Sequence, residues 1–240
     1  MKNVFLCLCL FFCAKTFAFP FKIVKGDSTI KSETRQATGY TALTSHGMMN
    51  VTISYGSSNT ITVETDENIL PYVETEVDNN ALTIKVKDNA ILKPTNGIKI
   101  HITMTKIGSI AQSGSGNITG AGNFSNDGKT IFNISGSGGI NLEFATINSV
   151  EIKTSGSSHL KLKGAINGLL SVSQHGSGNI DCENAPCESV EANMSGSSYA
   201  KVNVSKSITA HISGDGHIVY KGNPTEIDKK ISGSGSVSAM

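Results

Sequence analysis

The stretch Ser135–Phe144, SGSGGINLEF, joins a cluster of small residues to an alternating strand. Similar Ser/Gly clusters recur along the chain, and each contains a glycine that aligns with Gly136. Successive aligned glycines are 22, 20, 20, 20, 18 and 19 residues apart. A period near 20 residues, with diverse residues in between, predicts a structural repeat. The aligned glycines are Gly114, Gly136, Gly156, Gly176, Gly196, Gly214 and Gly233.

The residues between the clusters alternate with a period of two. Four and six positions after the aligned glycine, most units carry apolar residues such as Ile140 and Leu142, while the positions between are mostly polar. This alternation predicts strands with one buried face. Because the parity continues through the cluster, the aligned glycine and the residue two places later are expected at inward positions of a sharp corner, where only Gly or Ser leaves room. A flexible linker is the alternative, but a linker would not preserve the parity.

About twenty residues per turn, with short strands separated by corners, are typical of a solenoid. We therefore predict an all-β fold, a single-stranded right-handed parallel β-helix of about 20 residues per coil. Residues 40–106 alternate but lack the Ser/Gly cluster, and are predicted to form a β-rich cap on the repeats of residues 107–240 within one domain, with a short helical turn at Asp66–Tyr72. Residues 19–39 show little pattern and are expected to be loosely ordered.

Charged residues at outward positions suggest how the coils stack. Five and seven positions after the aligned glycine, successive units carry charges that mostly alternate in sign. Coils stacked in register at about 4.8 Å would place opposite charges side by side, and a slip in register would bring like charges together. The predicted outward charge ladder consists of Glu143, Lys161, Lys163, Asp181, Glu183 and Lys201.

The first 18 residues have the pattern of a secretory signal peptide. Lys2 supplies a positive charge, an apolar run follows, and Thr16–Ala18 offers a cleavage site with a small residue at its end. A lipoprotein with Cys13 at the modified position is the alternative, although the large Phe12 stands where a small residue is expected. The mature protein is therefore predicted to be exported to the periplasm, the cell surface or the medium.

Two cysteines remain in the mature chain. Cys182 and Cys187 are separated by the turn-forming sequence ENAP. In an oxidising compartment they would be able to form a disulfide that closes a small loop. The alternative is a pair of free thiols.

The composition excludes several classes of function. With 16% charged residues and a net charge of +1, the chain lacks the basic patch of a nucleic-acid-binding protein or of a membrane-surface protein. The six histidines show no metal-binding spacing, and the regular Asp of calcium-binding β-rolls is represented only by Asp215. We assign no catalytic, cofactor-binding or metal-binding residues, and expect no cofactor.

Three motifs resemble a known family. The stretch GIKIHITMTKIGSIAQSGSGNITG at Gly97–Gly120, the preceding alternating strands, and the recurring SGSGGINL and HGSGNID are similar to the autotransporter adhesin head domain, or head GIN domain. The resemblance covers residues 38–235. It implies an exported bacterial protein with a β-helix-like fold and no established enzymatic activity.

We therefore expect a non-catalytic binding module of the bacterial envelope, whose polar faces contact a glycan or a surface protein. One alternative is a structural envelope protein that assembles end to end through an open strand edge. Another is a polysaccharide-active enzyme that uses carboxylates on an outer face, such as Asp181 and Glu183, although the charge ladder accounts for the same residues.

Overall fold

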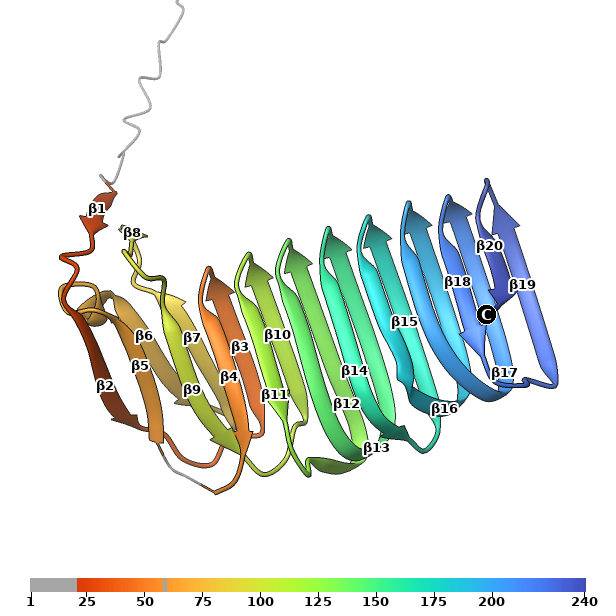
Figure 1. Ribbon diagram of the computed structural model, residues 1–240, viewed down its shortest axis with the longest axis horizontal. Helices are drawn as coiled ribbons and strands as arrows, with labels where there is room; N and C mark the ends of the chain where they lie inside the picture. Colours follow the sequence, from red (N-terminus) through yellow and green to blue (C-terminus); the bar gives the residue numbers. More distant parts are fainter. Residues whose placement is uncertain (1–20, 58–59) are drawn as a thin grey trace, which may run out of the picture.

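The computed structural model describes residues 21–57 and 60–240. It is an elongated β-solenoid of about seven turns with roughly 20 residues per coil, as the sequence predicts (Figure 1). The short helical turn predicted at Asp66–Tyr72 includes a 3-10 helix, η1 (Leu70–Tyr72). Within the described residues, no helix has the length and apolarity needed to cross a membrane. The predicted signal peptide lies outside the described residues.

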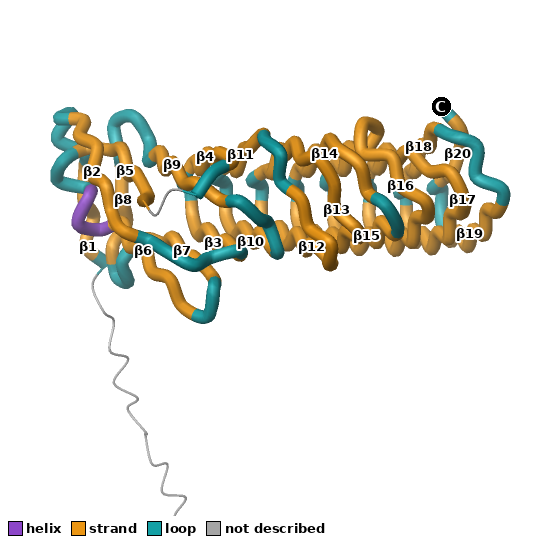
Figure 2. Tube along the Cα trace, turned by 90° about the horizontal axis from the view of Figure 1, so that it is seen from below, coloured by secondary structure: helices purple, strands orange, loops and turns teal. Residues whose placement is uncertain are grey.

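Each coil crosses two layers of strands, which we call face A and face B, and the strands of both layers are parallel except at the N-terminal end. The coils lie side by side along the long axis of the molecule (Figure 2). Strands of face A run up to the Ser/Gly corners, and the long strands β13, β16 and β17 continue around the opposite bend and belong to both faces. Face A contains, in spatial order, β6 (Val73–Asp78), β7 (Ala81–Val86), β3 (Ala42–Gly47), β10 (Ser109–Gly114), β12 (Ser125–Gly136), the second half of β13 (Gly139–Gly156), β15 (Leu169–Gly176), the second halves of β16 (Asn179–Gly196) and β17 (Tyr199–Gly214), and β19 (Glu226–Ser232).

Strands of face B begin just after the corners. At the N-terminal end of this face, β5 pairs antiparallel with both β2 and β9, whereas the remaining pairs are parallel. Face B contains, in spatial order, β2 (Ile30–Gln36), β5 (Thr60–Asp66), β9 (Lys99–Met104), β4 (Asn50–Tyr55), β11 (Asn117–Ala121), the first half of β13, β14 (His159–Ile166), the first halves of β16 and β17, β18 (His217–Lys221) and β20 (Ser236–Ala239).

The inward residues of both faces form one continuous hydrophobic core. Four positions before the aligned glycine, Phe132 and Ile152 are fully buried, and four positions after it Ile140 and Leu160 are 2% exposed. Stacked coils place like positions in direct register, as in the pairs Phe132↔Ile152 and Ile140↔Leu160. The period-two pattern therefore predicts the buried face correctly.

The region predicted as a cap also contains solenoid coils. β3 and β4 form a coil that ends at a corner glycine, Gly47, which the Ser/Gly pattern does not reveal. This coil lies between β7 and β9 on one side and β10 and β11 on the other, so it is flanked in space by segments that follow it in sequence. Antiparallel pairing of β5 with β9 and of β6 with β7 closes the N-terminal end.

The expectation that residues 19–39 are loosely ordered is wrong for the described part of this segment. β1 (Lys22–Lys25) pairs with β8 (Ala90–Lys93), and β2 pairs with β5 over seven residues. Almost every side chain of β2 is exposed, so neither face of the strand requires apolar residues and no alternation appears. Backbone pairing, which leaves no compositional pattern, holds this strand in place.

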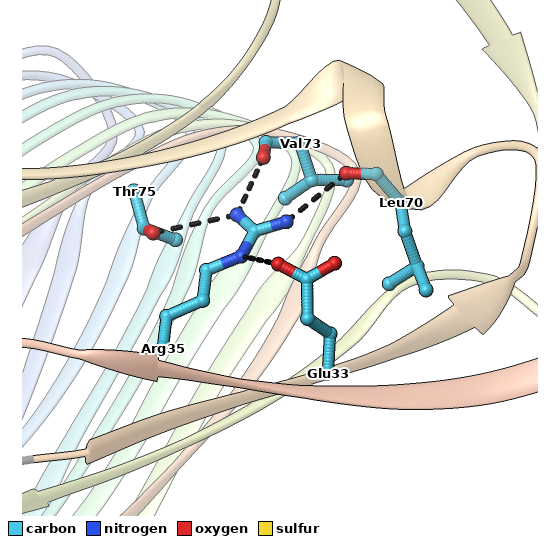
Figure 3. A network of polar contacts seen from close by, with 5 residues as sticks. All are labelled: Glu33, Arg35, Leu70, Val73 and Thr75. Atoms are coloured by element: carbon cyan, nitrogen blue, oxygen red, sulfur yellow. Dashed lines mark hydrogen bonds and ion pairs between the residues drawn. The ribbon is translucent and has the colours of Figure 1, made fainter.

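Arg35 fastens β2 to the end of the solenoid (Figure 3). Its guanidinium donates hydrogen bonds to the carbonyl oxygens of Val73 at 2.5 Å and Leu70 at 3.0 Å, and to Glu33 Oε1 at 2.7 Å. The planar fork of donors suits these convergent acceptors. Arg35 thus links the first edge strand to η1 and β6.

The corner glycines differ from the prediction in one respect. The second small residue of a cluster, such as Gly138, is buried as expected, but the aligned glycine itself is exposed or half-buried and is not inward. All seven aligned glycines have a positive φ, between 90° and 125°. A Cβ on Gly136 would lie 2.5 Å from the carbonyl oxygen of Gly114 in the preceding coil, and the other six show comparable approaches of 2.4–2.9 Å. The close contact between coils, together with positive φ, explains the requirement for glycine.

The inside of each corner is filled by complementary pairs of side chains. The inward positions two places before and two places after the aligned glycine meet at the corner, and in six successive coils the later position carries Gly or Ser, where a Cβ on Gly138 or Gly216 would approach an inward side chain of the same or the preceding coil. A Cβ on Gly178, for example, would lie 2.9 Å from Gln174 Nε2. Six successive pairs are Gln112/Gly116, Ile134/Gly138, Thr154/Ser158, Gln174/Gly178, Met194/Ser198 and Ile212/Gly216.

Two glycine-to-alanine substitutions separate backbone strain from the contact between coils. Gly47 has φ +98° and an added Cβ would meet nothing within 4 Å, whereas Gly136 has φ +106° and its Cβ would collide with the Gly114 carbonyl. We expect Gly47→Ala to lower the free energy of unfolding by about 1–2 kcal/mol. Gly136→Ala should cost about 1–3 kcal/mol more, because the stack must also shift. Urea unfolding of both variants measures the difference, and equal losses would contradict a steric role for the stacking contact.

Candidate binding surfaces

A shallow groove runs along face A beside the corners, and we call it groove A. Its first hollow has a volume of about 450 Å³. The outward residues one and three places before the aligned glycine line it, and small side chains such as Ala111, Ser113 and Ser135 leave the space open. His46 lies at one end and His175 four coils later at the other. The hollow is therefore produced by small residues that lie in register in successive coils.

Groove A continues beyond His175. A second hollow of about 340 Å³ is also lined by His175 and extends past His211 to Lys230. The lining positions are again those one and three places before the aligned glycine, such as Asn193 and Ser195. The two hollows therefore form one trough parallel to the long axis.

Hydrogen bonds between neighbouring coils orient the histidines at the rim. His46 Nδ1 lies 2.7 Å from Ser113 Oγ, and His175 Nδ1 lies 2.7 Å from Ser195 Oγ. Each pair joins adjacent coils at the same position in the repeat. Because a serine hydroxyl is hydrogen-bonded to Nδ1 of each ring, Nε2 is the remaining polar atom of both histidines.

A small charged cluster lies beside the middle of groove A. Glu151 Oε1 is 2.5 Å from Lys153 Nζ, and Glu151 Oε2 is 2.8 Å from Lys129 Nζ. Hydrogen bonds from Lys129 and Lys153 lower the pKa of Glu151 to about 2. Glu151 is therefore ionised at neutral pH and shared between two lysines, so that the cluster carries one net positive charge.

Face B carries the predicted charge ladder in part. Lys161 Nζ is 3.1 Å from Asp181 Oδ2 and Lys163 Nζ is 3.7 Å from Glu143 Oε2, and Asp181 is in register with Lys201. The placement of Glu183 is wrong, because Lys163 pairs with Asn184 instead. One additional residue in β16 relative to β14 shifts the register after Asp181.

Reversing two charges tests the ladder. Lys161→Glu with Lys163→Glu would place like charges beside Asp181 and Glu143, so the melting temperature should fall. Each exposed pair contributes only about 0.2–1 kcal/mol, and the effect should shrink at high salt. The matched control, Lys161→Gln with Lys163→Gln, removes attraction without adding repulsion and should lie between the wild type and the reversal. An unchanged melting temperature in the reversed variant would exclude the ladder as a stacking determinant.

A separate hollow lies on face B around Gly139. It has a volume of about 340 Å³, and its lining includes Asn117, Asn141, His159 and the Lys161–Asp181 ion pair. Gly139 lacks a side chain between Asn117 and His159, which precede and follow it in the column of stacked residues. Unlike groove A, this hollow contains a carboxylate.

Cys182 and Cys187 are free thiols in the structure and do not form the expected disulfide. Both side chains point into the core, where they are in register with Val202 and Val204, and Cys187 Sγ donates a hydrogen bond to the carbonyl oxygen of Asn203 at 3.3 Å. Burial raises the pKa of both thiols, to about 12 for Cys187. The two side chains therefore serve as small apolar core residues.

Thiol chemistry can verify this assignment. Because only the thiolate reacts and both groups are buried with raised pKa values, Ellman's reagent should label native residues 19–240 slowly at pH 8, and should label both thiols of this mature chain rapidly after unfolding. The intact mass should be the same with and without reductant. A non-reduced mass lower by two hydrogens would show that the disulfide forms.

The acidic and metal-ligating side chains of the described residues lie mostly apart from one another or in ion pairs. Within residues 21–57 and 60–240, no three His, Cys, Asp or Glu side chains are grouped so as to hold a metal ion. Asp181, the carboxylate considered for catalysis, is bound to Lys161 and accepts a hydrogen bond from the backbone N–H of Glu183 at 3.2 Å. These contacts support a structural role for Asp181.

Solved structures of similar fold include proteins from Bacteroides and Parabacteroides species. A "putative adhesin" from Bacteroides fragilis NCTC 9343 superimposes with a TM-score of 0.84 at 20% identity, over 90% of this chain and 100% of that chain. A "putative lipid binding protein" from Parabacteroides distasonis ATCC 8503 gives 0.67 at 23% identity, over 91% and 100%. A "putative adhesin" from Parabacteroides merdae ATCC 43184 gives 0.67 at 20% identity, over 91% and 99%. At these identities the likeness concerns the fold alone.

The comparison with protein families is more specific. No curated protein matches the chain significantly. The family described as "Putative auto-transporter adhesin, head GIN domain" matches residues 39–224, which include the corner glycines from Gly47 to Gly214. This match extends over most of the chain and agrees with the resemblance carried by the sequence motifs. The chain therefore belongs to the head GIN domain family.

Proposed function

We propose that this protein is an exported, non-catalytic binding module that holds a glycan or a surface protein along its solenoid faces. The observation that carries the proposal is the presence of extended polar hollows on the outer faces, lined by hydroxyl, amide and imidazole groups. Membership of an adhesin-like family supports the same function. The signal-peptide pattern in residues 1–18 supports export.

The solenoid is well suited to present such a surface. Its backbone hydrogen bonds connect each inner coil to both neighbours, and its inward residues build the core. Outward side chains are therefore held at a regular spacing of about 4.8 Å without being required for packing. A ligand would meet preorganised groups and would impose little ordering cost on the protein.

A binding screen with the mature chain, residues 19–240, tests the proposal. We expect binding to a subset of immobilised glycans or to intact host or bacterial cells, and no binding by the same protein after thermal unfolding. Fractionation of the native host should find the protein outside the cytoplasm. Failure to bind any glycan, surface protein or cell would contradict the proposed function.

A second candidate, end-to-end assembly, rests on the last coil. Within the described residues, β19 pairs only with β17 and β20 only with β18, so that their outer edges are open. Ile227 and Ile231 are 40% and 37% exposed there. However, Lys229 occupies the inward position that Ala210 holds in the preceding coil, and an inward charge on an edge strand opposes further pairing. Light scattering decides between the two: assembly requires association that rises with concentration, whereas the binding module should remain monomeric.

A further inference from the structure

We propose that groove A binds a linear acidic polysaccharide whose chain runs parallel to the solenoid axis. This inference rests on the proposed function and adds the class of ligand and its location. Shape, the chemistry of the lining and the local charge each support it.

The shape of groove A favours an extended polymer. The first hollow spans the coils from His46 to His175, which is four intervals of about 4.8 Å, or roughly 19 Å. The second hollow carries the trough three coils further, to Lys230. An open trough of this length provides repeated contacts for a linear chain but little enclosure for a single small molecule.

The lining of groove A selects against positively charged ligands. Its polar side chains are those of Ser, Thr, Asn, Gln, His and Lys, and no Asp or Glu is among the described residues that line either hollow. By contrast, the hollows of face B include Asp181 and Glu143. Hydroxyl, amide, imidazole and ammonium groups can all donate hydrogen bonds, so the trough suits a ligand rich in acceptor oxygens.

The charges around groove A also favour acidic sugar units. Lys153 lines the first hollow, and the cluster that it forms with Glu151 and Lys129 has one net positive charge. Lys230 lines the second hollow and has no ion pair in the described part of the chain. Three acidic residues of the same face, Glu151, Glu191 and Asp228, lie five positions before their aligned glycine, and all three are outside the lining. Hydrogen bonds from an ammonium group to a carboxylate are stronger than those between neutral groups.

The rim histidines supply further contacts at fixed places. Because Ser113 and Ser195 engage Nδ1 of His46 and His175, the ring orientation is set by the stack. Nε2 of each ring has no partner among the described residues. A sugar carboxylate or hydroxyl at either end of the first hollow would meet this nitrogen.

The experiment compares two serines of one coil on opposite sides of a corner. Ser135 lines groove A, whereas Ser137 follows Gly136 and lies outside its lining, and both side chains are exposed. Titration of the mature protein with polygalacturonate oligomers should show binding that weakens with salt. Ser135→Glu adds both bulk and negative charge to the trough and should weaken this binding at least about tenfold, which corresponds to about 1.4 kcal/mol. Ser137→Glu adds the same charge at the other side of the corner and should change affinity by less than about threefold.

Other probes separate failure of this inference from failure of the proposed function. Equal affinity for neutral dextran would overturn recognition by charge, and equal losses in Ser135→Glu and Ser137→Glu would overturn the location. Tighter binding of polyglutamate would indicate an acidic protein as the partner instead. No binding to polygalacturonate, with other ligands still found in the binding screen, would overturn the ligand class alone. Melting temperatures close to the wild type establish that both variants are folded.

Discussion

The contact between corner backbones of successive coils is the constraint on which the whole stack depends. The carbonyl oxygen of Gly114 accepts hydrogen bonds from the backbone N–H groups of Ser137 and Gly138 at 3.0 Å, and the same oxygen would be 2.5 Å from any Cβ on Gly136. Equivalent bonds join Gly47 to Ser115 and Gly136 to Ser157. The corner must therefore combine positive φ with the smallest residue at one position in every coil, and this requirement sets the register of all other positions.

Fixed register has a direct consequence for the outer surface. Once the corners align, each outward position forms a column along the molecule, and the size and charge of the residues in neighbouring columns decide where hollows form. Groove A arises where small residues such as Ser113 and Ser135 follow one another in register between the bulkier His46 and His175. The same register produces ion pairs on face B, where Lys161 meets Asp181. Binding surfaces in this fold are thus combinations of side chains from several coils.

The sequence predicts the repeat well because its two signals have simple physical causes. Glycine is required at the corner, and aliphatic residues are required at inward positions, so both leave a pattern in one chain. Gly47 does not stand out in this pattern because 67 residues separate it from Gly114, although the two are neighbours in space. Glu183 is misplaced because one extra residue in β16 shifts the register locally. The strand β2 is missed because backbone hydrogen bonds and Arg35 hold it, and neither requires alternation.

The candidate binding surfaces are harder to predict from the sequence than the repeat. Groove A is lined by Ser, Asn, Lys and His, which occur at outward positions throughout the chain, so only the registered stack shows which of them enclose a hollow. Whether Cys182 and Cys187 form a disulfide likewise depends on the direction of their side chains. Both side chains point inward at positions where the following coil carries valine. Short separation in sequence carries no information about the direction of these side chains.

The position of the β3–β4 coil has a consequence for folding order. This coil lies between strands from residues 81–104 and strands from residues 109–121, so that both of its edges remain unpaired until those later segments are available. The N-terminal half of the chain must therefore assemble as one cooperative unit, with contacts between residues far apart in sequence. Every later coil adds to a completed edge and needs only about twenty residues, as in other one-dimensional arrays. A chain synthesised from its N-terminus would thus complete its slowest folding step early. Each later coil would then add to the edge of the coil before it.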